Sequence, residues 1–151
     1  MQHLFTFALV LALLSGCAAT SSTSSSSVPL PPDLAITPPD AALAPQHRAF
    51  SGKWSGKWRG LAGGQQQETV LVVESVTADG ATVVYAQGDH SRFRSFHRRT
   101  TARIADGKLS FTFDQRSPIT FTYQLQPDGT LEAQSQSRGF TAVATLTRAS
   151  S

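Results

Sequence analysis

The chain has 151 residues, 15% of them charged, and a formal net charge of +3 at pH 7. All 13 lysines and arginines lie beyond residue 46, together with eight of the ten acidic residues, so this part carries a net charge of +5 and favours anionic partners. Its length of about 100 residues is ordinary for one domain with one core. The single cysteine, Cys17, excludes an intrachain disulfide, so packing must hold the fold.

The N-terminus carries a short apolar stretch, residues 4–13, followed by Leu-Ser-Gly-Cys at residues 14–17. A helix needs about 20 apolar residues to span a bilayer, so this stretch is too short and suits the apolar region of a secretory signal. The segment resembles the lipobox of bacterial lipoprotein precursors. The resemblance implies that residues 1–16 are a signal peptide and that Cys17 is acylated. The alternative is a plain secretory signal with a coincidental cysteine.

Lipidation of Cys17 would anchor the protein to a membrane that the chain itself does not cross. Two acyl chains anchor a protein stably, since each buried CH₂ contributes about 0.8 kcal/mol. In the lipoproteins that this segment resembles, an aspartate after the cysteine favours retention at the inner membrane, and here Ala18 and Ala19 follow. We therefore expect the mature protein at the outer membrane, anchored by its acyl chains and facing the periplasm.

A tether follows, over residues 17–46. Residues 20–27 are all serine or threonine and cannot bury enough apolar surface to offset chain entropy, and residues 28–45 contain six prolines. We expect a disordered linker whose first half is flexible and whose second half is extended and semi-rigid. Such a spacer could hold the domain several tens of Å from the bilayer, roughly as polyproline geometry allows. A proline-rich docking ligand is the alternative interpretation.

Residues 47–151 have the pattern of an all-β domain. Period-2 alternation of apolar and polar residues recurs between turn signals, without convincing helical periodicity. Asp-Gly pairs at 79–80, 106–107 and 128–129 indicate tight hairpins, since both central residues of a type I′ turn need φ above zero. Eight strands are predicted, at 51–59, 68–76, 81–87, 101–105, 108–113, 119–125, 130–135 and 140–148.

The first strand and the turns indicate how these strands are arranged. Glycine and tryptophan alternate on one face of residues 51–59, and small and large residues in turn suit the interior of a tapered barrel. Each turn joins sequence neighbours, which predicts a meander. Strands closed on themselves leave no exposed edge and enclose room for side chains or one small ligand. The predicted fold is a small eight-stranded antiparallel up-and-down barrel.

Gly52-Lys53-Trp54 on the first strand resembles the Gly-x-Trp signature of the calycin superfamily, which includes lipocalins and avidins. In that superfamily a basic residue near the end of the last strand packs across the tryptophan, a position that Arg148 matches. The resemblance implies a calycin-type binding barrel in which Trp54 and Arg148 are neighbours. Gly56-Lys57-Trp58 repeats the motif and leaves the register open.

The sequence contains no convincing catalytic constellation. Asp89, His90 and Ser91 are contiguous, whereas a triad needs three side chains that converge through the fold. The histidines lack metal-ligand spacing on a common strand face, although His90 and His97 could meet across a loop. No glycine-rich phosphate loop is present. We therefore expect no enzymatic activity, no metal and no cofactor.

The aromatic residues of the strands have two interpretations. They could line a ligand cavity, or they could fill a small barrel as an ordinary core, which is the commoner role. Trp54, Trp58 and Tyr85 stay candidates for a ligand site together with Arg148. The reason is that the polar atoms of tryptophan and tyrosine need hydrogen-bond partners when they are buried.

The strongest candidate for a binding surface is the run 90–99, which holds four arginines, two histidines and two phenylalanines. Guanidinium groups suit bidentate contact with phosphate or carboxylate, and phenylalanine can stack or insert. The alternative is a solvated barrel rim, or a strand extension with phenylalanine inward and arginine outward. The residues assigned to an anionic partner are Arg92, Phe93, Arg94, Arg98 and Arg99.

Together these observations predict a lipid-anchored envelope protein that acts as a binding or accessory module. Its expected partners are the membrane and an anionic glycan, a lipid head group, an envelope protein or a small ligand, and nucleic acid is not expected. The alternative is an inhibitor or accessory subunit of an envelope enzyme such as a lysozyme-type hydrolase. Against it, a domain of charge +5 would meet a usually cationic lysozyme with like charge.

Overall fold

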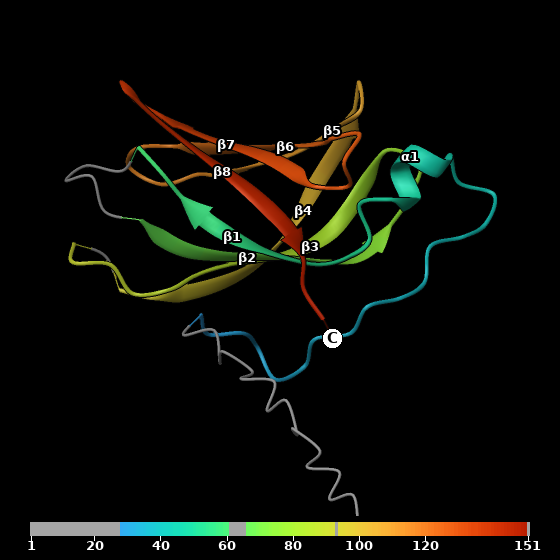
Figure 1. The fold of residues 1–151 in the computed structure, drawn as a ribbon, viewed down its shortest axis with the longest axis horizontal. Coiled ribbons are helices and arrows are strands. Elements are labelled where there is room, and N and C mark those ends of the chain that lie inside the picture. Colours follow the sequence, from blue (N-terminus) through green and yellow to red (C-terminus); the bar gives the residue numbers. More distant parts are fainter. Residues whose placement is uncertain (1–27, 61–65, 93, 151) are drawn as a thin grey trace, which may run out of the picture.

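The computed structural model describes residues 28–60, 66–92 and 94–150, which form an all-β domain. Cys17 and Phe93, two of the predicted site residues, lie outside these ranges. Within them, no helix is long and apolar enough to cross a membrane. The elements labelled in Figure 1 are α1 (Pro45–Arg48), β1 (Gly52–Trp58), β2 (Gln67–Val76), β3 (Gly80–Gln87), β4 (Phe96–Ala105), β5 (Lys108–Phe113), β6 (Ile119–Leu125), β7 (Leu131–Ser137) and β8 (Phe140–Arg148).

The strands pair in sequence order and close into a barrel of eight strands (Figure 1). Every neighbouring pair is antiparallel. The last strand returns to the first, with Arg148 opposite Trp54 and Leu146 opposite Gly56. Closure pairs both edges of the sheet, which would otherwise expose unpaired backbone groups. The predicted up-and-down barrel is therefore confirmed.

Alternation along the strands directs the large apolar side chains into the barrel. On β5, Leu109, Phe111 and Phe113 are buried, whereas the residues between them are exposed or half-buried. On β6, Phe121 and Tyr123 are buried in the same way. All five belong to one core cluster inside the barrel. Burial of this core from water is the main force that holds the domain together.

The seam between β1 and β8 depends on Gly56. A Cβ atom at this position would lie 2.4 Å from the carbonyl oxygen of Thr145, a backbone atom that cannot rotate away. Glycine therefore permits the close approach of the two strands. The alternation of small and large residues on the first strand therefore permits closure of the barrel, because Gly56 is the small residue that lies against the backbone of β8.

The three Asp-Gly pairs all lie at hairpins, but only one has the predicted turn geometry. At residues 106–107 both residues have positive φ, 51° and 70°. At residues 128–129 only the glycine does, and at 79–80 neither does. There the Thr77 hydroxyl accepts the N–H of Gly80 at 3.1 Å and shapes the turn instead. The pairs thus mark hairpin positions reliably, whereas the side chains around them decide the turn type.

Strand β4 is longer than predicted. It begins at Phe96, five residues before the expected start at 101, and pairs with β3 along all of Gly80–Gln87. The run of basic residues at its start interrupts the apolar alternation, so the pattern alone places the strand too late. Strand β7 likewise ends at Ser137, two residues beyond the predicted 135.

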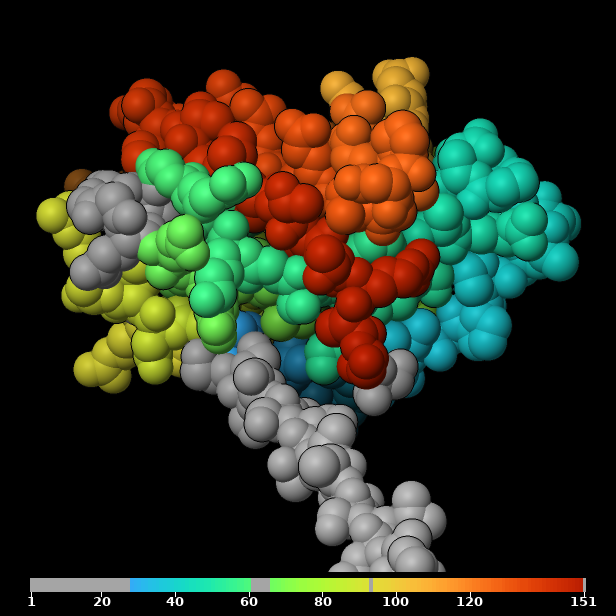
Figure 2. All heavy atoms as spheres, in the orientation of Figure 1, coloured from blue at the N-terminus to red at the C-terminus, as the bar shows by residue number. Residues whose placement is uncertain are grey.

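The proline-rich segment that was predicted as a spacer packs on the outside of the barrel. Residues 28–44, called the strap below, run along the barrel wall toward α1 (Figures 1 and 2). Val28 is buried there, and Leu30 and Leu34 pack beside it. The strap covers an apolar patch on the outer faces of β2 and β3, formed by Val70, Val72, Val84 and Ala86. The prediction of a free spacer over residues 28–45 is therefore corrected. The apolar residues between the prolines pack on this patch, which holds the segment against the barrel.

An ion-pair cluster clamps the strap to the barrel wall. Arg99 of β4 donates from Nε to Glu74 of β2 at 2.8 Å and from Nη1 to Asp33 of the strap at 2.9 Å. The backbone N–H of Thr37 donates to the Glu74 carbonyl oxygen at 2.7 Å, and that of Ala35 donates to its carboxylate at 3.4 Å. Glu74 is 7% exposed, so its charge needs these partners.

Candidate functional site

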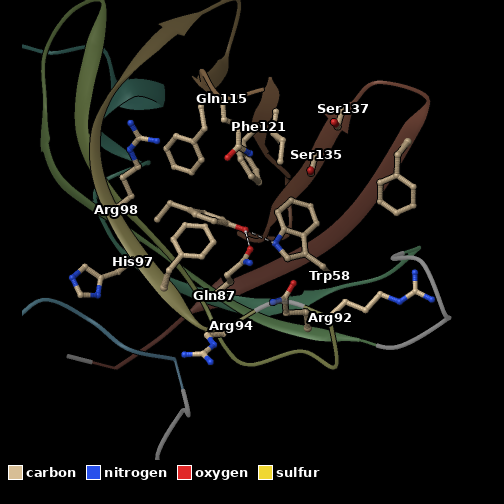
Figure 3. Close-up of a pocket in the computed structure, with 16 residues that line it drawn as sticks. Trp58, Gln87, Arg92, Arg94, His97, Arg98, Gln115, Phe121, Ser135 and Ser137 are labelled. Atoms are coloured by element: carbon tan, nitrogen blue, oxygen red, sulfur yellow. Dashed lines mark hydrogen bonds between the residues drawn. The ribbon is translucent and has the colours of Figure 1, made fainter. Parts of the chain in front are cut away.

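The barrel holds a cavity of about 850 Å³ that opens at the end where β1, β3, β5 and β7 finish (Figure 3). This volume lies within the range of small-ligand sites, roughly 300–1,000 Å³. At the other end Phe50, which follows α1, is buried in the core cluster. Side chains therefore fill one end of the barrel and leave room for a ligand at the other, which we call the mouth.

A chain of hydrogen bonds lies along the side of the cavity that β1 and β3 form. Trp58 Nε1 donates to the Tyr85 hydroxyl at 3.1 Å, and this hydroxyl donates to Gln87 Oε1 at 2.9 Å (Figure 3). Trp58 is the last residue of β1, and the other two side chains come from β3. Burial raises the pKa of Tyr85 to about 12, because the phenolate would lose its hydration. The neutral phenol thus orients both neighbouring side chains.

Aromatic rings form the walls. The ring centroid of Tyr85 lies 4.6 Å from that of Phe121, 5.8 Å from that of Phe113 and 5.9 Å from that of Phe96. Phe96 and Phe140 stay partly exposed at the mouth, at 38% and 37%. These rings contact one another in tilted and edge-on arrangements. They form an apolar lining that suits a flat or aliphatic ligand.

Cationic side chains surround the mouth. Arg98 of β4 faces inward, and its guanidinium lies 4.8 Å from the ring centroid of Phe113. Arg92 and Arg94, from the β3–β4 connection at residues 88–95, line the same cavity (Figure 3). No aspartate or glutamate is among the described residues that line it. Positive charge beside an apolar interior attracts anions.

Amides and hydroxyls supply a few neutral polar groups. Ser135 and Ser137 of β7 and Gln115 of the β5–β6 connection line the cavity (Figure 3). Gln67, 2% exposed, donates from Nε2 to the carbonyl oxygen of Gly88 at 2.8 Å and so holds the start of the β3–β4 connection. An apolar lining with few polar groups is typical of sites that orient a ligand by its polar end.

The structure separates the two tryptophans. Trp58 and Tyr85 line the cavity, whereas Trp54 and Arg148 lie outside its lining. The Arg148 guanidinium lies 4.2 Å from the ring centroid of Trp54, and the two residues face each other across the β1–β8 seam. The predicted neighbour relation is therefore confirmed, with the register of the first Gly-x-Trp motif. This pair closes the barrel and does not contact the cavity.

The basic run 90–99 does not act as a single loop. Residues 96–99 belong to β4, as the strand-extension alternative has it, but Arg98 faces inward rather than outward. It lines the cavity together with Arg92 and Arg94, which belong to the connection before the strand, although Figure 3 shows the guanidinium groups of these two extending away from the interior. His97 is also among the lining residues, but Figure 3 shows its imidazole directed away from the cavity, on the outer side of β4.

The assignment of Arg99 to an anionic partner is corrected. Its guanidinium already binds the carboxylates of Glu74 and Asp33, on the outer face of the barrel. The hydrogen bonds that Arg99 donates to these carboxylates keep its pKa far above the ordinary value, and the contact with Asp33 holds the pKa of that carboxyl below its ordinary value. Arg99 therefore belongs to the strap clamp, and the sequence could not show this because its partners lie 25 and 66 residues away.

The contiguous Asp89, His90 and Ser91 belong to the connection at the mouth. Asp89 Oδ1 accepts the N–H of Ser95 at 2.8 Å, and His90 Nδ1 accepts the N–H of Arg92 at 3.2 Å. Both contacts shape the connection. In the part of the chain that the structure describes, no group of three or more His, Cys, Asp or Glu side chains is placed to hold a metal ion.

Sequence reasoning singled out Trp58 and Tyr85 but not the other strand residues of the lining apart from Arg98, and many of these follow one rule. In a meander, odd strands finish and even strands begin at the same end of the barrel. The last residue of each odd strand and the first residue of each even strand all line the cavity. These residues are Trp58, Gln67, Gln87, Phe96, Phe113, Ile119, Ser137 and Phe140. The strand order alone indicates which strand ends meet at the mouth. Naming the lining residues also requires the exact residue at which each strand begins or ends.

The fold and the cavity define a class of protein: a closed eight-stranded antiparallel barrel with a ligand-sized cavity at one end, consistent with a calycin-like fold. No protein-family model matches the sequence, and no curated protein is significantly similar to it. The site is therefore interpreted from its own geometry.

Proposed function

We propose that this protein is a lipid-anchored cell-envelope protein whose barrel binds a small amphipathic anion. The apolar or aromatic body of the ligand enters the cavity. Its carboxylate, phosphate or sulfate group stays at the mouth, between the arginines. Binding, and not catalysis, is the proposed activity.

The observation that carries the proposal is the inward-facing Arg98 above an aromatic cavity. A guanidinium offers planar donors that match a carboxylate or phosphate group. Its contact with the ring of Phe113 holds it over the apolar lining at the mouth, where it can meet the charged end of a ligand. Each Å² of apolar ligand surface covered by the rings contributes roughly 25 cal/mol. The charge contact with Arg98 and the burial of apolar surface together favour a ligand that is apolar at one end and anionic at the other.

One sequence feature supports the envelope placement, and one structural contact supports the calycin relationship. The lipobox at residues 14–17 supports an acyl anchor on Cys17, at the outer membrane and facing the periplasm. The stacked pair of Trp54 and Arg148 supports a relationship to calycins, a superfamily of binding barrels. An inhibitor of a lysozyme-type enzyme is less well supported, because the positive mouth would oppose encounter with a cationic lysozyme.

Tryptophan fluorescence tests the proposal. Trp58 lines the cavity and Trp54 does not, and these are the two tryptophans of the chain. Bromododecanoate, whose bromine quenches only at near contact, should quench Trp58 in the mature chain. Bromododecanol has the same body without the carboxylate and should bind about ten-fold more weakly, since a hydrogen bond to a charged group contributes about 1.5–3 kcal/mol. A Trp58→Phe variant should lose the quenching.

Two arginines on the same strand give a matched pair of variants. Arg98→Met should bind bromododecanoate about ten-fold more weakly and bromododecanol unchanged, because only the charge contact is lost. Arg103→Met changes an exposed arginine near the opposite end of β4 and should bind both as the parent does. Equal affinity of the parent for the acid and the alcohol, or equal effects of the two variants, would contradict the proposed ligand class.

A further inference from the structure

The connections at the mouth carry a net positive charge. The described residues 60, 66, 88–92, 94–95, 114–118 and 138–139 contain four arginines and two aspartates. At the opposite end, the hairpin turns at residues 77–79, 106–107 and 126–130 contain three aspartates, and Arg48 of α1, Lys108 and Arg148 lie near them. Arg59 follows β1 but shares a surface pocket with Asp128 and Glu132. An anionic surface would therefore attract the connections of the mouth.

Exposed aromatic rings accompany this charge. Of the four large apolar side chains exposed among the described residues, two are phenylalanines at the mouth, Phe96 and Phe140. They are the first residues of β4 and β8, so the barrel holds their backbone in place. Aromatic rings sit at the head-group level of bilayers, and arginines pair with the phosphates there. The mouth thus combines the two residue types of a membrane-contacting surface.

The strap places the start of the packed chain on the mouth side of the barrel wall. Val28 belongs to the cluster that Val70, Val72, Val84 and Ala86 form on the barrel wall, and the strap then runs past Glu74 to α1 at the closed end (Figure 1). Val70 precedes Glu74 on β2, which begins at the mouth. Ten residues, 18–27, separate Cys17 from Val28, and a chain of that length spans at most about 33–36 Å. An acyl anchor on Cys17 would therefore keep the barrel close to its bilayer.

We propose that the mouth of the barrel rests on the anionic surface of the bilayer that holds the acyl anchor. The arginines of the mouth contact lipid phosphates, and Phe96 and Phe140 enter the head-group layer. The ligand is an anionic amphiphile of this bilayer, and it passes between the bilayer and the cavity without crossing open water. This inference rests on the proposed function and specifies the source of its ligand.

Vesicle binding tests which end makes the contact. The mature chain, with Cys17 capped by a small maleimide, is sedimented with vesicles of phosphatidylcholine alone or with added phosphatidylglycerol. Binding should require phosphatidylglycerol and weaken with salt. The double variant Arg116→Ser/Arg138→Ser removes two mouth charges outside the cavity lining and should bind about 25-fold more weakly, at about five-fold for each arginine. The matched double variant Arg103→Ser/Lys108→Ser, near the opposite end, should bind as the parent does.

Hydrogen exchange of the anchored protein tests the orientation. The single thiol of Cys17 allows the mature chain to be coupled to a maleimide lipid in the same vesicles. Amides of residues 88–92 and 138–139 should exchange more slowly when phosphatidylglycerol is present. Those of the turns at 106–107 and 126–130 should not change. Protection at these turns, or equal effects of the two double variants on vesicle binding, would overturn the inference.

The two proposals can fail separately. The bromododecanoate titration is done in free solution and does not depend on a bilayer, whereas the exchange experiment does not depend on an added ligand. A normal titration without protection at the mouth would overturn the membrane orientation and leave the ligand proposal standing. Protection at the mouth without binding of bromododecanoate would support the orientation and overturn the ligand proposal.

Discussion

Arg148 lies across Trp54 at the seam of the barrel, with its guanidinium 4.2 Å from the indole centroid. The same guanidinium donates to the carbonyl oxygens of Ser51 at 2.8 Å and Ala49 at 2.7 Å. The indole N–H of Trp54 donates to the carbonyl oxygen of Phe50 at 2.8 Å. A side chain at the end of the last strand thus holds the segment that closes the barrel opposite the mouth.

Arg148→Met should destabilise the domain without changing ligand affinity. Methionine keeps much of the apolar stem but loses a cation–π contact of about 0.5–2 kcal/mol and two hydrogen bonds of about 1 kcal/mol each. We expect the free energy of unfolding in urea to fall by about 2.5–4 kcal/mol. Arg103→Met, which replaces an exposed arginine, should change the free energy of unfolding by less than about 0.5 kcal/mol. Equal losses in the two variants would contradict the seam role of Arg148.

Gly56→Ala should destabilise the barrel through its backbone. The added Cβ would approach the carbonyl oxygen of Thr145 at 2.4 Å, so β1 and β8 would have to separate. Forced overpacking of this kind costs about 1–3 kcal/mol, measurable as a lower urea midpoint. Ser55→Ala changes the neighbouring residue, which lies on the other face of β1, and should cost much less. A stable Gly56→Ala variant would show that the seam can open without penalty.

Arg99→Met should release the strap from the barrel wall. The variant leaves the nearly buried carboxylate of Glu74 without its guanidinium and removes the ion pair with Asp33. Backbone amides of Ala35 and Thr37, which donate to Glu74, should therefore exchange with solvent many-fold faster. Asp33→Asn keeps the contact between Arg99 and Glu74 and should have a smaller effect.

Acid should loosen the same clamp. The hydrogen bond from Arg99 holds the pKa of Asp33 below its ordinary value of 3.8. A carboxylate with a lowered pKa stabilises the folded state fully above its unfolded pKa, and this contribution is lost as pH falls through the folded pKa. The protection factors of the strap amides, which compare their exchange with that of the unfolded chain at the same pH, should therefore fall in the parent below about pH 4. Asp33→Asn should lack the part of this fall that comes from Asp33, and an identical pH profile would contradict the assignment.

Both tyrosines should resist ionisation in the folded protein. Burial raises the pKa of Tyr85 to about 12 and that of Tyr123 well above its ordinary value of 10. A raised pKa stabilises the fold below the ordinary value, and this contribution is lost as pH rises through the folded pKa. An absorbance titration should therefore show no phenolate near pH 10 in the native state and both phenolates there in urea. Phenolate formation near pH 10 in the native protein would contradict the burial of these rings.

Cys17→Ala should abolish acylation. The lipobox at residues 14–17 has its thiol at this position, and the chain has no other cysteine. Labelling of cells with radioactive palmitate should mark the parent protein and not the variant, which should accumulate as precursor or as soluble domain. Ser15→Ala, which keeps a small residue in the motif, serves as the control and should still be labelled. Unchanged labelling of Cys17→Ala would contradict the anchor.

Local patterns were sufficient to predict the strands and their order. The bounds of β5, β6 and β8 match their predictions, because alternation and turn residues act over a few neighbouring positions. The seam pair was also predictable, since the Gly-x-Trp motif and the last strand define both partners. The start of β4 was not predictable from local patterns, because its basic residues form a strand only through their pairing with β3.

By itself the sequence determined an all-β meander with a Trp54–Arg148 seam, since both depend on short-range patterns and on strand order. Only the tertiary structure decided which arginines are available to a ligand. Arg98 and Arg99 are adjacent in the chain but face opposite sides of β4, so one reaches the cavity and the other reaches Glu74 and Asp33. The cavity and the docked strap likewise depend on contacts between residues far apart in the chain, and the closed barrel is what brings those residues together.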